Sequence, residues 1–203
     1  MKDPARRPIG ERFDYLLHVL SSQRFLAMQG LGNEVPFFIC PFDPREANDM
    51  ARLVKNLVTS LERKGVRVLT VNLYDLSIEL LQKRGIWKRI LVQESDLPKS
   101  ELKELLQGVL DPETHVVPAI AEKIQERPIS PDILFITGVG EVFPYIRSHT
   151  VLNNLQRVAK DHPTVLFFPG QYVQSAERGA SLDLFGRLHD DRYYRAFNIY
   201  YSP

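Results

Sequence analysis

The sequence predicts an α/β fold with three layers, in which a mostly parallel, five-stranded sheet lies between helices. Two observations support this class. Short apolar segments alternate along the chain with longer segments of helical periodicity, a succession typical of parallel sheets with helical crossovers. The apolar segments are also nearly continuous in hydrophobicity, which indicates strands that are buried on both faces.

Five segments have the length and the aromatic or β-branched composition of buried strands. They span residues 35–40, 66–73, 132–137, 164–168 and 194–200. Pro41 and Pro44 are expected to stop the first of them, and Pro169-Gly170 is expected to end the fourth. We expect these segments to form one sheet with right-handed crossovers.

Amphipathic helices are predicted between these strands and before the first. The clearest has apolar residues at i, i+3, i+4, i+7, i+8 and i+11 over residues 50–61, and Gly65 is expected to end it. The other helices are expected over residues 11–28, 76–92, 100–110 and 116–124, and from Ser148 to a point before Pro163. Gly85 weakens the helical pattern of 76–92, and Ser148 is expected to be an N-cap.

The composition limits the class of protein. The chain has 203 residues, without an evident linker or repeat, and is expected to form one domain over residues 1–203. Lys and Arg number 26 against 25 acidic residues, so the net charge of +1 provides no global basic field for nucleic acid. Cys40 is the single cysteine, which excludes an intrachain disulfide and a zinc site built from cysteines.

The sequence also bears on localisation. Its first residues contain no uninterrupted apolar core of the kind found in signal peptides. The longest apolar runs have the length of strands and are too short to span a membrane. We therefore expect a cytoplasmic protein.

The carboxyl ends of parallel strands are where α/β folds place their ligand sites. Four predicted loops follow strands: residues 41–44, 74–75, 138–141 and 169–172. The candidate binding residues in them are Asp43, Tyr74, Asp75, Gly138, Gly140 and Glu141. This expectation applies to any ligand, including another protein.

The glycine loop at residues 138–140 is a poor phosphate site. A P-loop needs the pattern GxxxxGK[ST], which the sequence lacks, and the loop after the first strand is PFDP, whose prolines have no amide donor. Gly138 and Gly140 supply only the first two glycines of a dinucleotide fingerprint, since Phe143 stands at the third position. The loop is therefore predicted to be a tight structural turn.

Two carboxylates at strand ends are candidate catalytic groups. Glu141 could act as a base, or be a surface carboxylate at a helix start; Asp75 could do the same, or cap the next helix. Spacing reveals no acid–base partner for either, and the histidines lack the spacing of a metal site. We predict no catalytic residue, metal or cofactor, and retain a hydrolase that uses Asp75 and Glu141 as an alternative.

Two polar clusters are candidate binding surfaces. The first surrounds a predicted helix start, where free amides could hold an anion or a partner's carboxylate, unless Ser148 caps them: Arg147, His149, Asn153 and Asn154. The second interleaves arginine and tyrosine near the C-terminus: Arg187, Arg192, Tyr193, Tyr194 and Arg195. That mixture is favoured at protein interfaces and also suits single-stranded nucleic acid, whereas an edge strand with solvated arginines is the simpler explanation.

Three long segments, in order, resemble the BrxB family of bacterial BREX (bacteriophage exclusion) operons. They are MQGLGNEVPFFI (28–39), TGVGEVFPYIRSHTVLNNLQ (137–156) and SLDLFGRLHDDRYYRAFNI (181–199). The resemblance covers nearly the whole chain and implies a role in phage defence rather than a known reaction. Proteins of this family accompany a phosphatase-like protein (PglZ), an adenine-specific methyltransferase (PglX) and a large ATPase (BrxC).

The resemblance and the missing motifs together suggest a P-loop ATPase-like domain that lacks the P-loop. For such a domain the expected strand order is 5-1-4-3-2. The leading hypothesis is a non-catalytic component of a BREX complex that binds PglZ, with PglX and BrxC as further candidate partners. The alternatives are a nucleotide- or nucleic-acid-binding subunit of the same complex, and the hydrolase named above.

Arg195→Ala tests the C-terminal cluster. If Arg195 pairs with an acid of a protein partner, its truncation should weaken that association about tenfold or more, while the melting temperature changes little. Calorimetry with the partner and with DNA, together with a thermal scan, separates the alternatives. A salt-dependent loss of DNA affinity alone would indicate nucleic-acid binding. Unchanged partner affinity would remove Arg195 from the interface.

Overall fold

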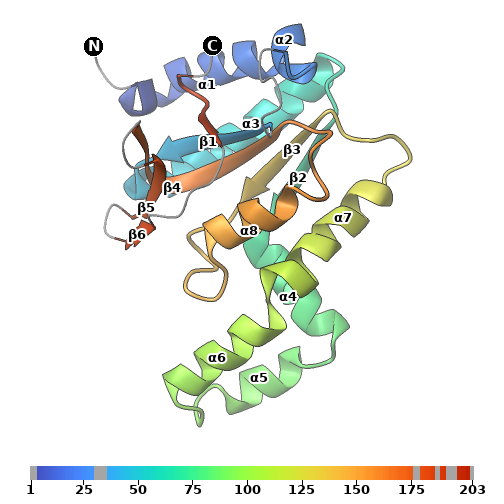
Figure 1. Cartoon of the computed structure of the whole chain (residues 1–203), viewed down its shortest axis with the longest axis vertical. Helices are drawn as coiled ribbons and strands as arrows, with labels where there is room; N and C mark the ends of the chain where they lie inside the picture. The colour runs from blue at the N-terminus through green and yellow to red at the C-terminus, as the bar shows by residue number, and fades with distance from the viewer. Residues whose placement is uncertain (1–3, 30–35, 176–178, 186–187, 191–195, 202–203) are drawn as a thin grey trace.

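A central parallel sheet organises the structure, a computed structural model that describes residues 4–29, 36–175, 179–185, 188–190 and 196–201 (Figure 1). Its strands are β1 (Phe37–Phe42), β2 (Val68–Asn72), β3 (Ile133–Thr137), β4 (Thr164–Ser175) and β7 (Phe197–Asn198). They lie in the order β2-β3-β4-β1-β7, and each neighbouring pair is parallel. The predicted order 5-1-4-3-2 is thereby confirmed.

The fourth strand continues past the point where the sequence predicted its end. Beyond its parallel pairing with β1, β4 pairs antiparallel with β5 (Gly179–Leu184), which pairs with β6 (Leu188–Asp190). Pro169 lies opposite Phe42 at the last parallel pair, and Gly170 lies opposite Leu184 at the first antiparallel one. The prediction that Pro169-Gly170 ends the strand was wrong, because these residues mark a change of pairing partner. The prediction that Pro41 stops the first strand was also wrong, because β1 continues through Pro41 to Phe42, paired with β4.

Helices cover both faces of the sheet. One face packs against α1 (Ile9–Leu20), α2 (Gln23–Leu26) and α3 (Ala47–Arg63), whose buried apolar residues meet Phe38, Cys40 and Phe135 of the strands. Short 3-10 turns, η1 (Pro4–Arg6) and η2 (Pro44–Glu46), precede α1 and α3. The periodicity predicted for residues 50–61 is seen in α3, which buries Met50, Leu53, Val54, Leu57 and Leu61.

The opposite face packs against α4 (Leu73–Lys83), the π-helical turn η3 (Pro112–Val116), α7 (Val117–Gln125) and α8 (Ser148–Leu155). Two further helices, α5 (Trp87–Gln93) and α6 (Lys99–Val109), form a hairpin that extends away from the sheet (Figure 1). Lys83 pairs with Glu122 and Arg84 donates to the Val109 carbonyl, so these cations attach α4 to α7 and α6. The three-layer α/β class predicted from the sequence is confirmed.

Several helix boundaries differ from the prediction. The helix expected over 11–28 is divided between α1 and α2, because the Ser22 hydroxyl accepts a hydrogen bond from the Phe25 amide and starts a new helix. The helix expected over 76–92 is divided at Gly85, which has a φ of 70°. Ser148 is the first residue of α8 and not its N-cap, a position that Arg147 holds without a side-chain hydrogen bond.

Within the described part of the chain, the helices are too short or too polar to cross a bilayer.

Arg12 is the largest buried polar side chain and connects three elements. Its side chain is 1% exposed, Nη1 donates to the Ala5 carbonyl over 3.1 Å, and Nη2 donates to Glu46 Oε2 over 2.8 Å. Ala5 belongs to η1 and Glu46 is the N-cap of α3. A buried guanidinium needs such partners, since its desolvation is otherwise costly.

Replacing Arg12 with methionine should lower the free energy of unfolding by about 2 kcal/mol, because hydrogen bonds of a charged group are lost. Arg52→Met is the matched control: Arg52 is exposed and pairs with Asp49 one turn away in α3, so its loss should cost no more than about 0.5 kcal/mol. Urea unfolding of both variants measures the difference. Equal losses would show that the Arg12 contacts contribute no more than a surface ion pair.

Candidate functional site

Two adjoining clefts lie at the carboxyl edge of the sheet. The first, the α3 cleft, has a volume of about 800 Å³ and lies between one side of α3 and the ends of β2, β3 and β4. The second, the hairpin cleft, has a volume of about 1140 Å³ and lies between η1, η2, the end of β1, β4 and Tyr201. Phe42, Pro44 and Phe185 line both and form the wall between them.

The loop at 138–141 approaches the start of α4 closely. The Asn72 side chain caps α4, its Oδ1 accepting hydrogen bonds from the amides of Tyr74 over 2.8 Å and Asp75 over 3.3 Å. Gly138 has a φ of 75°, and a Cβ at this position would stand 2.3 Å from Asn72 Oδ1. Glycine is required here by conformation and by space, which supports the structural interpretation of the motif.

The structure brings four of the predicted residues into the α3 cleft: Asp75, Gly138, Gly140 and Glu141. Asp75 comes from the first turn of α4 and Glu141 from the loop after β3, and both are exposed. Lys55, from α3, lines the same cleft. Tyr74, which precedes Asp75, is also exposed. The two carboxylates of the cleft can therefore pair with basic groups of a ligand, and Lys55 can pair with an acidic group.

Asp43 lines the hairpin cleft, where its carboxylate pairs with Arg45. Asp43 Oδ2 accepts from Arg45 Nη2 over 2.6 Å, and Oδ1 accepts from the Arg45 amide over 2.9 Å. The Arg45 side chain, followed by its backbone amide, lowers the pKa of the Asp43 carboxyl to about 2. Asp43 thus stays ionised at neutral pH and caps η2.

Phe185 is part of the wall between the clefts, and it contacts both β4 and the loop after β3. Its amide donates to the Pro169 carbonyl over 2.9 Å, and its ring lies 3.0 Å from where a Cβ of Gly140 would be. Its φ of 56° is rare for a residue with a side chain and carries backbone strain. Sequence analysis did not place Phe185 at this edge, because it ended the fourth strand too early and so overlooked the following hairpin.

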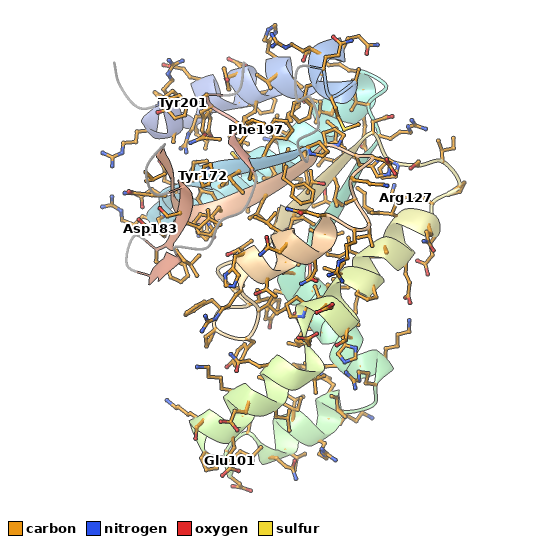
Figure 2. All side chains as sticks on the ribbon, in the orientation of Figure 1. Glu101, Arg127, Tyr172, Asp183, Phe197 and Tyr201 are labelled. Carbon is orange, nitrogen blue, oxygen red and sulfur yellow. The ribbon has the colours of Figure 1, made fainter. Side chains whose placement is uncertain are left out.

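Exposed apolar side chains gather at this edge. Val173 and Tyr201 line the hairpin cleft, and Phe185 lines both clefts. Figure 2 shows Tyr172, Asp183 and Tyr201 at the same end of the molecule, far from Glu101 of α6. The Tyr172 hydroxyl donates to the Ala196 carbonyl over 2.6 Å, which attaches the segment before β7 to β4. Val173 is exposed because side chains alternate along β4 and Tyr172 is buried. Sequence analysis did not use this alternation, because it expected the strand to end before residue 172.

The predicted residues at the start of α8 and within it do not line the clefts. Arg147 is exposed at the start of α8 and His149 is buried within that helix, on the opposite face of the sheet from α3. The Asn154 amide nitrogen donates to the Thr150 carbonyl of the same helix, and Asn153 is exposed. Arg187, Arg192, Tyr193, Tyr194 and Arg195 lie outside the described residues. Among the residues described, no three His, Cys, Asp or Glu side chains form a group that could hold a metal ion.

Gly138→Ala should lower the free energy of unfolding by about 2 kcal/mol or more, because the new methyl strains the backbone and displaces the Asn72 cap. Gly108→Ala is the matched control: Gly108 lies inside α6 with no atom near a built Cβ, so this change should stabilise the protein by about 0.5–1 kcal/mol. Thermal and urea unfolding measure both. A neutral Gly138→Ala would mean that the loop does not need glycine.

Comparison with known proteins places the chain in a family. The model of the family "BREX protein BrxB" matches residues 69–199. A BREX protein BrxB of Bacillus cereus (strain H3081.97) is 34% identical over 202 residues, which are 95% of this chain and 98% of that protein. A BREX protein BrxB of Escherichia coli O9:H4 (strain HS) is 29% identical over 180 residues, 89% of this chain and 86% of that protein. No solved structure matches the chain. The chain therefore belongs to the BrxB family of BREX proteins.

Proposed function

We propose that this protein is a non-catalytic docking subunit of a BREX phage-defence system, and that it binds a PglZ-type protein through the carboxyl edge of its sheet. One observation carries the proposal: three exposed apolar side chains, Val173, Phe185 and Tyr201, line the two clefts there. Exposed apolar groups that cluster beside concave surfaces are typical of protein interfaces.

The C-terminal segment supports the same surface. The arginine and tyrosine residues at 192–195 directly precede Ala196, which Tyr172 holds against β4. Tyr201, at the other end of the described segment, is 60% exposed and lines the hairpin cleft. Tyrosine contributes strongly to protein interfaces, so Tyr201 is suited to bind a partner that covers this edge.

The geometry favours a protein partner over a nucleotide. A phosphate at a strand end needs free backbone amides, yet Asn72 already accepts from the Tyr74 and Asp75 amides and Asp43 accepts from that of Arg45. Asp75 and Glu141 also place negative charge at the α3 cleft, which repels phosphate groups.

A hydrolase remains the second candidate, because Asp75 and Glu141 line one cleft. Turnover that Glu141→Gln abolishes would be the evidence for it.

Calorimetric titration with the PglZ protein of the same operon should give an affinity in the micromolar range or tighter. Val173→Lys should weaken it about tenfold or more, because a buried charge would replace an apolar contact. Val92→Lys is the matched control: Val92 is 74% exposed on α5, against 48% for Val173, and lies in the helical hairpin remote from the clefts. This change should leave the affinity unaltered.

Failure of the two folded proteins to associate at micromolar concentrations would overturn the proposed partner. Equal effects of the two lysine variants would move the interface away from the hairpin cleft. Melting temperatures measured in parallel show whether either variant is misfolded.

A further inference from the structure

The α3 cleft lies beside a part of the sheet that helices leave uncovered. Side chains of β2 alternate between the two faces: Leu69 and Val71 are buried in the core with α4, whereas Thr70 faces the α3 side and is exposed. Among the described residues, β2 pairs only with β3 and is an edge strand. On the α3 side, the cleft therefore continues from α3 across the ends of β3 and β2.

The α3 wall of this cleft is one continuous stripe. Ala47, Ala51, Lys55 and Thr59 follow each other at a spacing of four residues, about one helical turn, and Val58 lies beside the last of them. From the first to the last, the stripe is about 18 Å long at 1.5 Å per residue, which matches about three turns of a second helix. Ala47 and Ala51 are small, so a second helix can pack closely against this part of α3.

Charge is distributed unevenly along the cleft. Asp75 and Glu141 are at the end formed by the loop after β3 and the start of α4, whereas Lys55 projects from the middle of the α3 stripe. The rest of the lining is largely apolar and includes Val54, Val58 and Phe167. An occupant that complements this pattern has an apolar face, a basic end and an acidic group near its middle.

We propose that the α3 cleft takes an amphipathic helix of the partner protein, which lies along α3 and places a Lys or Arg against Asp75 and Glu141. The proposal rests on the docking function above and specifies the partner's chemistry. Apolar residues at i, i+3 or i+4, and i+7 of that helix fill the cleft, in the helix-in-groove mode of recognition. The bound helix adds to the layer that α1 and α3 form on this face.

A helix fits these features better than the other occupants. A small ligand would not need the whole length of the stripe from Ala47 to Thr59. A second copy of this chain would have to supply such a helix itself, and its binding would appear as self-association. Both outcomes are separable by experiment.

The first test fills the cleft. Ala51→Arg places a long side chain in the cleft and should weaken partner binding about tenfold or more. Asn56→Arg is the matched control, since Asn56 is an exposed residue of the same helix that does not line the cleft. Asp75→Asn combined with Glu141→Gln should weaken binding several-fold and flatten its dependence on salt, because it removes the acidic end. If Ala51→Arg and Asn56→Arg bind the partner equally, the proposal is wrong.

The second test identifies the occupant by photo-crosslinking. Cys40 is fully buried, and burial raises the pKa of its thiol to about 12, so maleimide reagents will modify only an introduced cysteine in the folded protein. A benzophenone maleimide is attached at Thr59→Cys, an exposed position of the stripe, and at Asn56→Cys as the control. Each labelled protein is irradiated with the purified BREX proteins of the operon, and crosslinked peptides are identified by mass spectrometry.

The expected product joins position 59 to an amphipathic helical segment with a basic end, and the control gives no such product. Capture of this kind of segment from a BREX protein other than PglZ would refute the partner proposed above and support the cleft assignment. PglZ that binds without this crosslink, and is unaffected by Ala51→Arg, would refute the cleft assignment alone. Capture of an extended segment, crosslinking to a second copy of this chain, or no capture from any BREX protein would each overturn the helix proposal.

Discussion

The close approach of β4 and β5 at Gly170 is the constraint on which the carboxyl edge depends. A Cβ at residue 170 would stand 2.1 Å from the Asp183 carbonyl oxygen, so no other residue fits without moving one of the strands. Pro169, just before it, lacks an amide donor, but its carbonyl accepts from Phe185. Together they allow one strand to leave a parallel sheet and enter an antiparallel hairpin. This change of pairing partner positions Phe185, which forms the wall between the two clefts together with Phe42 and Pro44.

The hairpin cleft also depends on contacts that hold both ends of the described chain against β1. The Tyr15 hydroxyl of α1 donates to the Ile199 carbonyl over 3.1 Å, and Cys40 of β1 lies 3.5 Å from the Tyr200 hydroxyl. Burial raises the pKa of Tyr200, so its hydroxyl stays protonated. Arg12 adds its bonds to Ala5 and Glu46 on the same side. Tyr201 and η1 reach the cleft from opposite ends of the chain because these contacts fix them to one strand.

The parts of the fold that could be predicted from sequence are those that hydrophobic burial decides. Continuous apolar segments predicted the parallel strands, and the helical period from Met50 to Leu61 predicted α3. Both patterns reflect which faces of the strands and of the helix are buried. The errors arose at residues whose local preference is compatible with more than one structure. Pro169-Gly170 is a common strand end, yet here tertiary pairing uses both residues inside a strand. Serine is a common N-cap, yet here Arg147, with its extended backbone, is the N-cap, and α8 begins at Ser148, one residue earlier than predicted.

The candidate site was only partly predictable for a related reason. Asp75, Gly138, Gly140 and Glu141 were expected together because parallel strands end at one edge, a rule of topology that needs no side-chain detail. The position of α8 on the face opposite α3 could not be read from Arg147 or His149, since both faces of the sheet are apolar. The contribution of α3 was also missed, because Ala51, Lys55 and Thr59 are unremarkable residues of a helix until the neighbouring sheet is found uncovered.

The carboxyl edge has two clefts, but its own side chains use the backbone amides that a phosphate would need. Asn72 and Asp43 each accept from backbone amides at a helix start, and Gly138 leaves just enough room for Asn72 to do so. These caps remove donors for an anion, and Asp75 and Glu141 add charge of the wrong sign. What remains at the edge is apolar surface, in Phe185, Val173 and Tyr201, beside concave walls. Such a surface contributes binding energy mainly when another apolar surface covers it, which a protein segment provides and a nucleotide phosphate does not.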